Sequence, residues 1–505
     1  MEPGQRSRKT GAAGRGNGAA HFRFPDRGPV TARPNEQKQK SDHPKEDPMP
    51  DTHQPAPQGT TETPTRDLAQ WVSGVSSDDF GDRPRRWARH AILDWFGVTL
   101  AGATDPLVGI LAADALDAGE AGTARLVGRA EKVTPSFAAM INGAASHALD
   151  YDDVNKRLHG HPTVPVVPAV LALAEQKGLS GRDVVEAFIV GYEAECLIGE
   201  MMGMNHYDHG WHATATVGTF GAAAACARLL GLDAEKSAMA LGTAATQAAG
   251  LKSMFGTMCK PLHAGKAAMN GLMAARWAAR GFTSRPDALE CAQGFGTTQS
   301  TEFQGLPVRA DAAAPFAVEQ NLFKYHAACY LTHSSIEAIR ELKQHHDFTA
   351  DQVTAVRALV DAGHRKVCDI PEPETGLQVK FSIRHCIAMA LTGIDTGDRE
   401  IYTEATAARP DLVALRRKVE LEDKIHDSRH AAEVVIDLAD GRSLVQYFDV
   451  GVPADDLDAQ EQRLIAKFRR LAEPILGVEK AKKIEDLVLG LDNAKGVTEL
   501  MSAAG

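Results

Sequence analysis

The feature that most constrains the fold is a long succession of helical segments rich in alanine, glycine and other small residues. Apolar residues recur at three- and four-residue spacing over residues 87–98, the pattern of an amphipathic helix. Six more segments read as helices with short breaks between them: 107–116, 133–148, 163–177, 181–203, 213–230 and 234–250. Asp233 fits the N-cap of the last one. Because small residues allow helices to pack closely, the sequence predicts a large all-α helical domain over residues 64–319.

The pattern changes near residue 320. Residues 353–360 are rich in β-branched side chains, and two alternating runs on either side of Asp440-Gly441 predict a β-hairpin. Residues 334–343 and 382–391 read as helices. We expect a smaller α/β (α+β) lid domain over residues 320–452, and helices in residues 453–505 that rejoin the helical domain. The expected fold class is therefore mostly α.

Residues 1–63 are expected to be a disordered N-terminal extension. They hold nine of the 25 prolines and few large apolar residues, so they cannot bury enough surface to offset the entropy of ordering. The early arginines resemble a transit peptide only faintly, because no amphipathic face accompanies them. A start at Met49 is the simpler alternative.

Composition excludes several classes of protein. A net charge of −11 gives no electrostatic reason to expect nucleic acid or an anionic membrane surface as a partner. The seven cysteines form no CxxC pair, which disfavours a disulfide framework, an iron–sulfur cluster or a structural zinc and favours a reducing compartment. No apolar run approaches the roughly 18 residues that a transmembrane helix needs. We expect a soluble, cytoplasmic protein.

Acidic and imidazole side chains are concentrated between the helices predicted at 133–148 and 163–177. Asp150, Asp152 and Asp153 are followed within a few residues by His159 and His161. A solvated loop would be the simplest interpretation of such a segment. The density of acids and imidazoles between two apolar helices instead indicates a site of proton transfer.

A second patch contains three histidines at three-residue spacing, His206, His209 and His212. A metal site is disfavoured because Gly210 and Trp211 interrupt a regular helical face. We expect His206 and His209 to be exposed, and His212 to point from a helix start into a cavity.

A third patch places Lys260, His263 and Lys266 around a turn that leads into a helix. Cations near a helix N-terminus are disfavoured by the helix dipole unless an anion shares the site, and a carboxylate substrate would supply that anion. The segments 324–333 and 380–386 add further lysine, histidine and cysteine residues. No nucleotide-binding loop, nucleophile elbow or HExxH motif is present. Without a cofactor motif, these groups suit removal of a proton next to a carboxylate, with lysines holding the negative charges.

Several of these segments together resemble one family. The stretches ASHALDYDDVNKRLHGHPTVPVVPAVLALAE, HGWHATATVGTFGAAAACARLLGLD, FGTMCKPLHAGKAAMNG and KYHAACYLTH are similar to motifs of the MmgE/PrpD family, in the same order. That family includes 2-methylcitrate dehydratase, cis-aconitate decarboxylase and an iminodisuccinate epimerase. The resemblance covers residues 65–500 and implies a helical domain with an α/β lid, a homodimer, and a cofactor-free site without metal in the cleft between the domains.

The resemblance implies six site residues, Asp150, His161, His212, Lys260, Lys324 and Cys329, and we add Lys266 from the basic patch and His385 from segment 380–386, in two sets. The catalytic set is Asp150, His161, His212 and Lys260, and the substrate-binding set is Lys324, Cys329, His385 and Lys266. Two positions depart from the decarboxylase pattern, since Val154 replaces a threonine and His385 replaces a tyrosine. The loop before His161 is also one residue longer.

We therefore expect a lyase that acts on a small di- or tricarboxylate, most simply a dehydratase of the 2-methylcitrate type. His161 or His212 would move the carbon-bound proton. Asp150 would orient a histidine or, if burial raised its pKa, act as the acid toward the leaving hydroxyl. An epimerase or decarboxylase on the same scaffold, and a non-catalytic carboxylate-binding protein, remain as alternatives.

Overall fold

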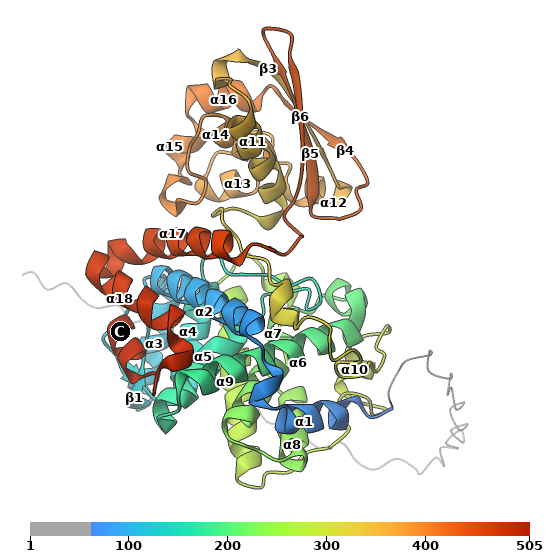
Figure 1. Ribbon diagram of the computed structural model, residues 1–505, viewed down its shortest axis with the longest axis vertical. Helices are drawn as coiled ribbons and strands as arrows, with labels where there is room; N and C mark the ends of the chain where they lie inside the picture. Colours follow the sequence, from blue (N-terminus) through green and yellow to red (C-terminus); the bar gives the residue numbers. More distant parts are fainter. Residues whose placement is uncertain (1–61) are drawn as a thin grey trace, which may run out of the picture. The chain divides into compact units, whose positions relative to one another are not determined.

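The computed structural model of the protein describes residues 62–505 (Figure 1). The extension expected at residues 1–63 therefore lies almost entirely outside the described residues. In the N-terminal part the helices are α1 (Pro64–Gly74), α2 (Asp82–Gly102), α3 (Pro106–Asp117), α4 (Pro135–His147), α5 (Thr163–Lys177), α6 (Gly181–Asp208), α7 (Ala213–Leu229), α8 (Ala234–Ala245), α9 (Cys259–Ala279) and α10 (Phe295–Gln299). The mostly-α fold class is confirmed. Asp233 caps α8, since its side chain accepts a hydrogen bond from the Lys236 backbone N–H at 2.8 Å.

Small residues bring two of these helices into backbone contact at the place that later carries the site. A Cβ atom on Gly143 of α4 would lie 2.9 Å from the Cα atom of Gly265 in α9, and a Cβ on Gly265 would clash with the carbonyl oxygen of Met140. Any larger side chain at either position would separate the helices. This crossing sets the C-terminal end of α4 beside the first turns of α9.

The C-terminal helices are α17 (Leu457–Leu476), α18 (Val478–Leu489) and α19 (Thr498–Ala504), and their apolar residues share one hydrophobic cluster with α1 to α9. A buried ion pair joins α17 to α2, where the Nζ of Lys467 lies 2.6 Å from an oxygen of Asp94. Lys467 also donates to the backbone carbonyl of Tyr151 at 2.8 Å. The last part of the chain thus supports the segment that follows α4.

A four-stranded sheet forms the second part, with strand order β4-β3-β5-β6. Its strands are β3 (Val353–Val360), β4 (Val419–Asp423), β5 (Ala431–Leu438) and β6 (Ser443–Asp449). The predicted hairpin is confirmed as β5–β6, with Gly441 of the turn at φ 89°. Strand β4 was not predicted; it pairs in parallel with β3, through residues far apart in sequence.

Helices pack beside this sheet, with α11, α14 and α16 to one side of it in Figure 1. This part contains α11 (His333–His345), α12 (Ala362–Cys368), α13 (Gly376–Lys380), α14 (Ile383–Leu391), α15 (Glu404–Ala407) and α16 (Pro410–Arg416). Its apolar residues form a second hydrophobic cluster, which Val98, Tyr151 and Leu471 join from the helical part. A small two-stranded sheet, β1 (Ala121–Arg125) with β2 (Lys132–Val133), was not predicted.

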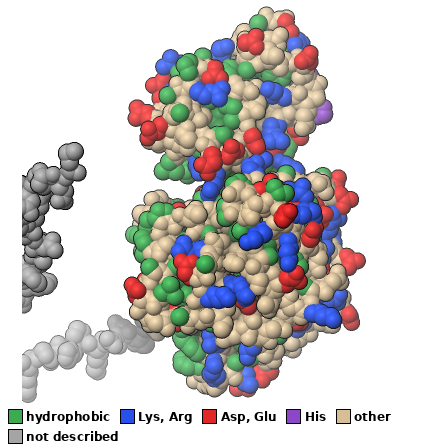
Figure 2. Space-filling view, turned by 90° about the vertical axis from the view of Figure 1, so that its left-hand side faces the viewer, with side chains coloured by type: hydrophobic (Ala, Val, Ile, Leu, Met, Phe, Trp, Pro, Cys, Tyr) green, Lys and Arg blue, Asp and Glu red, His purple; other side chains and the backbone are tan. Residues whose placement is uncertain are grey.

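Within residues 62–505, no single helix is both long and apolar enough to cross a membrane, and only α2 and α3 taken together, across a bend of 84°, reach the required length and composition. On the face shown in Figure 2, Lys and Arg side chains are interspersed with Asp and Glu. That face therefore has the mixed charge of an ordinary protein surface.

Candidate active site

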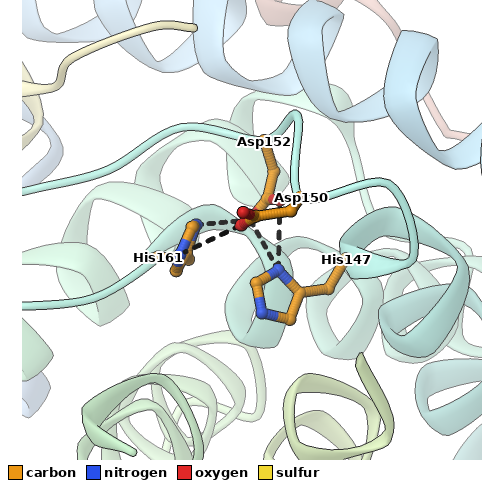
Figure 3. A group of neighbouring side chains, drawn as sticks. All are labelled: His147, Asp150, Asp152 and His161. Carbon is orange, nitrogen blue, oxygen red and sulfur yellow. Dashed lines mark hydrogen bonds and ion pairs between the residues drawn. The ribbon is translucent and has the colours of Figure 1, made fainter. Parts of the chain in front are cut away.

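The loop between α4 and α5 carries the first group of site residues, and its backbone is unusual at Asp150. Asp150 has φ 51°, a left-handed conformation that few residues other than glycine adopt and that aspartate tolerates better than most. Such conformations cost free energy and are concentrated at functional sites. The turn follows directly on the end of α4 at His147, so that imidazole and the loop carboxylates lie together (Figure 3).

Asp152 bridges two imidazoles. One of its oxygens lies 3.0 Å from Nδ1 of His147 and 2.9 Å from Nδ1 of His161. Burial alone would raise the pKa of Asp152, but the two imidazoles hold it well below its usual range, so this carboxyl group is ionised. Nδ1 of His147 is hydrogen-bonded to the ionised Asp152, and Nδ1 of His161 lies within ion-pair distance of the same oxygen, so each Nε2 faces away from Asp152. Burial lowers the pKa of His147 to about 4, which makes this ring neutral at pH 7.

Asp150 is the meeting point of two ammonium groups from different parts of the chain. Its Oδ1 lies 2.8 Å from the Nζ of Lys260 and 3.1 Å from the Nζ of Lys324. Lys324 also donates to the backbone carbonyl of Asp150 at 2.7 Å, and Nε2 of His161 lies 3.7 Å from the same Oδ1. The structure therefore brings Lys260 and Lys324, from different parts of the chain, together at Asp150 and beside His161.

This geometry corrects one prediction. Burial favours protonation of Asp150, but Lys260 and Lys324 outweigh it and hold the pKa of Asp150 well below its usual range. The role of a general acid, which requires a raised pKa, is therefore wrong for Asp150. Its carboxylate instead orients the two ammonium groups. Burial alone would lower the pKa of Lys324, but Asp150 raises it above its usual value, so Lys324 stays charged.

A short backbone pairing explains why Lys324 reaches the loop. Val154 and Leu322 exchange backbone hydrogen bonds of 2.9 Å and 3.0 Å as an isolated antiparallel bridge. The bridge holds the segment that leads into the α/β part against the α4–α5 loop. Lys324, only 2% exposed, is thereby fixed beside Asp150.

His212 approaches the same cluster from the start of α7, where it is the N-cap residue. Its ring centroid lies 5.8 Å from that of His147 and 5.3 Å from that of His263. Burial, reinforced by the nearby imidazoles and by Lys260, lowers the pKa of His212 well below its usual range, so the ring is neutral. The cluster therefore holds two neutral imidazoles, His147 and His212, near two cations.

One histidine prediction is wrong. His206 is 2% exposed rather than solvated, because Nε2 lies 2.7 Å from the Thr216 hydroxyl and Nδ1 lies 3.2 Å from the Gln299 carbonyl oxygen. It is a hydrogen-bonded residue of the helical core. His209 is exposed, as predicted.

The carboxylates and imidazoles also have the composition of a metal site. Ligand atoms of His147, Asp150, Asp152 and His161 all lie within 4.8 Å of one another. However, the Oδ1 of Asp150 already accepts two ammonium groups, and a divalent cation there would be repelled by both. The two ammonium groups therefore disfavour a metal ion at Asp150.

Two predicted binding residues lie away from Asp150. Lys266 lies six residues beyond Lys260 in α9, about 240° around the helix, and its Nζ lies 3.7 Å from the Met269 sulfur. His385 is fully buried beside Arg416, and burial together with that guanidinium lowers its pKa to about 4. The structure brings neither residue into contact with Asp150.

Cys329 lies nearer to the cluster. A hydrogen bond with the Cys368 thiol lowers its pKa, against the opposing effect of burial, and the charges of Asp150 and Lys324 act on it. Its backbone N–H donates to the Lys380 carbonyl oxygen at 3.0 Å. Cys329 therefore borders the site without a hydrogen bond to the carboxylates.

Four residues near the site were absent from the two predicted sets: His147, Asp152, His263 and Lys380. Asp152 lies two positions after Asp150, a usable signal, whereas the place of His147 depends on the α4–α9 crossing and that of His263 on the approach of α9 to the His212 segment. Lys380 ends α13, and its pKa, lowered by burial, is influenced by the charges of Asp150 and Lys324.

Comparisons with known proteins agree on one family. The MmgE/PrpD N-terminal domain matches residues 66–304, and the MmgE/PrpD C-terminal domain matches residues 326–493. A cis-aconitate decarboxylase from Aspergillus terreus is 29% identical over 465 residues, which cover 86% of this chain and 95% of the relative. The cis-aconitate decarboxylase of Homo sapiens is 27% identical over 442 residues, covering 83% and 90%. A cis-aconitate decarboxylase-like protein from Aspergillus oryzae is 26% identical over 472 residues, covering 87% and 96%.

Proposed function

The chain belongs to the MmgE/PrpD family, and from that premise we propose that it is a cofactor-independent lyase that acts on a small di- or tricarboxylate. The observation that carries the proposal is the convergence of Lys260 and Lys324 on one carboxylate oxygen of Asp150, beside His161. Two ammonium groups held this close form a ready site for substrate carboxylates.

Lys260 and Lys324 bind the carboxylates of the substrate. One comes from the first turn of α9 and the other from the segment that leads into the α/β part, so a ligand that engages both is held at two points. Two-point binding fixes the carbon next to a carboxylate relative to the imidazoles, which is the positioning that proton transfer requires.

His161 serves as the base. Its Nδ1 lies 2.9 Å from the Asp152 carboxylate, which favours a proton on Nδ1, and its Nε2 lies 3.7 Å from Oδ1 of Asp150. The same arrangement, an imidazole held by a buried carboxylate, orients the general base of serine hydrolases. In the proposed reaction Nε2 of His161 takes the proton from the carbon next to a substrate carboxylate.

Dehydration of a 2-methylcitrate-type substrate is the finer proposal. That reaction needs one group to take the carbon-bound proton and another to give a proton to the departing hydroxyl, so that water leaves and a carbon–carbon double bond forms. His161 and His212 are two imidazoles with separate partners, Asp152 and His263. Two separately positioned rings suit a reaction with two proton transfers.

Decarboxylation of a cis-aconitate-type substrate is the second candidate. The names of the relatives favour it. The same two lysines would hold the substrate, one imidazole would deliver a proton to carbon, and carbon dioxide would leave. Epimerisation would need the same proton transfer without any leaving group.

Proton NMR in deuterium oxide tests the proposal and separates the reactions. Citrate, 2-methylcitrate, cis-aconitate and aspartate-derived dicarboxylates are incubated with the enzyme, and loss of the proton signal next to a carboxylate reports abstraction. Dehydration adds a conjugated alkene with ultraviolet absorbance, decarboxylation releases carbon dioxide, and epimerisation changes only the stereochemistry.

Variants complete this test. His161→Ala should abolish exchange without lowering the melting temperature, while His209→Ala, at an exposed histidine, should exchange normally. Saturable binding of these acids with no exchange in the wild type would instead indicate a non-catalytic carboxylate-binding protein. A homodimer in the cytoplasm, which light scattering and cell fractionation can check, completes the proposal.

A further inference from the structure

His212 forms a hydrogen-bonded pair with His263 on the side away from His161. Their Nδ1 atoms lie 3.0 Å apart, so one nitrogen carries a proton and the other accepts it. His263 belongs to the second turn of α9 and is partly exposed, whereas His212 is 2% exposed. The pair therefore joins a buried imidazole at the carboxylate cluster to an imidazole that solvent reaches.

The backbone around the pair is fixed on both sides. The N–H of His212 donates to the Gly250 carbonyl at 3.0 Å, and the N–H of Lys252 donates to the Gly210 carbonyl at 2.8 Å. A Cβ atom on Gly250 would lie 3.3 Å from the His263 ring and would clash with the Cβ of Ala215. Glycine at this position lets the His212 segment approach α9 closely enough for the two rings to bond.

His212 cannot store a positive charge easily. His147, His161 and Lys260 face it together with His263, and burial in this group disfavours its imidazolium form. His212 is therefore a neutral ring, and when its Nε2–H gives a proton to a leaving group, its Nδ1 must receive another proton, because the alternative is an imidazolate anion. The nitrogen opposite its free Nε2 already lies 3.0 Å from a ring that reaches solvent.

We propose that His263 is a positioning and proton-relay residue for His212, an inference that rests on the proposed proton transfer. Nε2–H of His212 gives its proton to the departing hydroxyl, while Nδ1 of His212 takes the proton from Nδ1 of His263. Nε2 of His263 then takes a proton from water. One proton moves from solvent to the leaving group, and both rings end neutral, in the opposite tautomer. After the product leaves, a water molecule that enters the site returns a proton to Nε2 of His212, and the reverse transfer along the pair restores the starting tautomers.

Two substitutions separate the relay from simple positioning. His263→Asn keeps a hydrogen-bonding atom near the position of Nδ1 but cannot carry a proton from solvent, and His263→Ala removes both functions. His209→Ala is the matched control, because His209 is an exposed histidine that bonds only to Asn205, at 3.1 Å. Turnover and deuterium exchange are measured with 2-methylcitrate, and with citrate and cis-aconitate alongside, together with the melting temperature of each variant.

Both His263 variants should lose about 100-fold in turnover, the lower end of the range for a positioned acid–base group, with KM unchanged. Added imidazole should restore His263→Ala in proportion to its concentration, as a mobile substitute for the missing ring. On a His212→Asn background, His263→Ala should cause no further loss, because the relay acts only through His212.

Three results would overturn the relay. They are full activity of His263→Asn, a slow His263→Ala that imidazole does not restore, and an equal loss in His209→Ala. The proposed function itself fails if the wild type exchanges no proton in any of the acids. Only the relay fails if the wild type exchanges normally and the His263 variants turn over as fast as the wild type.

Discussion

Asp152→Asn is the substitution that most directly tests how the site makes a base. An oxygen of the buried carboxylate lies 3.0 Å from Nδ1 of His147 and 2.9 Å from Nδ1 of His161. An amide of the same shape has no charge and one oxygen instead of two. It can present an N–H to an imidazole, which would force the proton of His161 onto Nε2 and remove the lone pair that faces the substrate.

The structure sets the size of the effect. When His161 takes a proton it becomes a cation beside the Asp152 anion, and unit charges about 4 Å apart attract by about 4 kcal/mol at an effective dielectric constant of 20. Loss of this attraction raises the barrier by the same amount, which corresponds to about 10³-fold in rate. KM should change little, because Lys260 and Lys324 remain to hold the substrate.

Asp153→Asn provides the matched control. Asp153 is the next residue and is equally buried, but it accepts from the side-chain amide of Asn321 at 2.7 Å and from the hydroxyl of Thr163. Burial raises the pKa of Asp153 to about 7, and no contact joins it to the imidazoles among the described residues. Deuterium exchange, kcat, KM and the melting temperature are measured for both variants. Normal exchange in Asp152→Asn, or an equal loss in Asp153→Asn, would refute the reasoning.

Three further predictions address binding and stability. Lys260→Met and Lys324→Met should each raise KM about 10- to 100-fold in steady-state assays, because each removes a charge-assisted hydrogen bond worth roughly 1.5–3 kcal/mol, and an unchanged KM would contradict the binding role. Lys467→Met should lower the free energy of unfolding, measured in urea, by about 3–5 kcal/mol, because it leaves the Asp94 charge buried and unpaired. Adding Asp94→Leu should recover most of that loss. A double variant that is as unstable as Lys467→Met alone would refute this account. Burial, with Asp153 nearby, raises the pKa of Glu195 well above its usual range, so Glu195 keeps a proton in the folded state that it releases in the unfolded chain. The free energy of unfolding should therefore fall as the pH rises above the ordinary glutamate pKa. Urea titrations at several pH values should show a weaker pH dependence for Glu195→Gln.

Local signals account for the parts of the fold that could be predicted. The helical segments have apolar spacing that is independent of their neighbours, and Asp440-Gly441 determines its hairpin by turn chemistry alone. Strand β4 escaped prediction because its five residues acquire a partner only when β3, about sixty residues earlier, lies alongside in parallel. Parallel pairings between strands far apart in the chain cannot be predicted from a short segment of the sequence.

The same distinction applies to the site. Asp150, His161, His212, Lys260 and Lys324 were selected from motifs, and the structure brings them together. His147 was not selected because its place depends on how closely α4 and α9 approach, and His263 was not selected because it meets His212 only where α9 approaches the start of α7. Lys266 was selected because it is near Lys260 in sequence, but six residues along a helix place it on another face.

The ion pairs of Asp150 have a consequence for ligand selection. Since Asp150 satisfies Lys260 and Lys324 by itself, an incoming acid meets a built-in competitor rather than bare cations. A ligand with one carboxylate replaces one ion pair with another and therefore gains little binding free energy. A ligand with two carboxylates spaced to engage both lysines at once forms more ion pairs than it breaks, so Asp150 makes the site selective for ligands with more than one carboxylate.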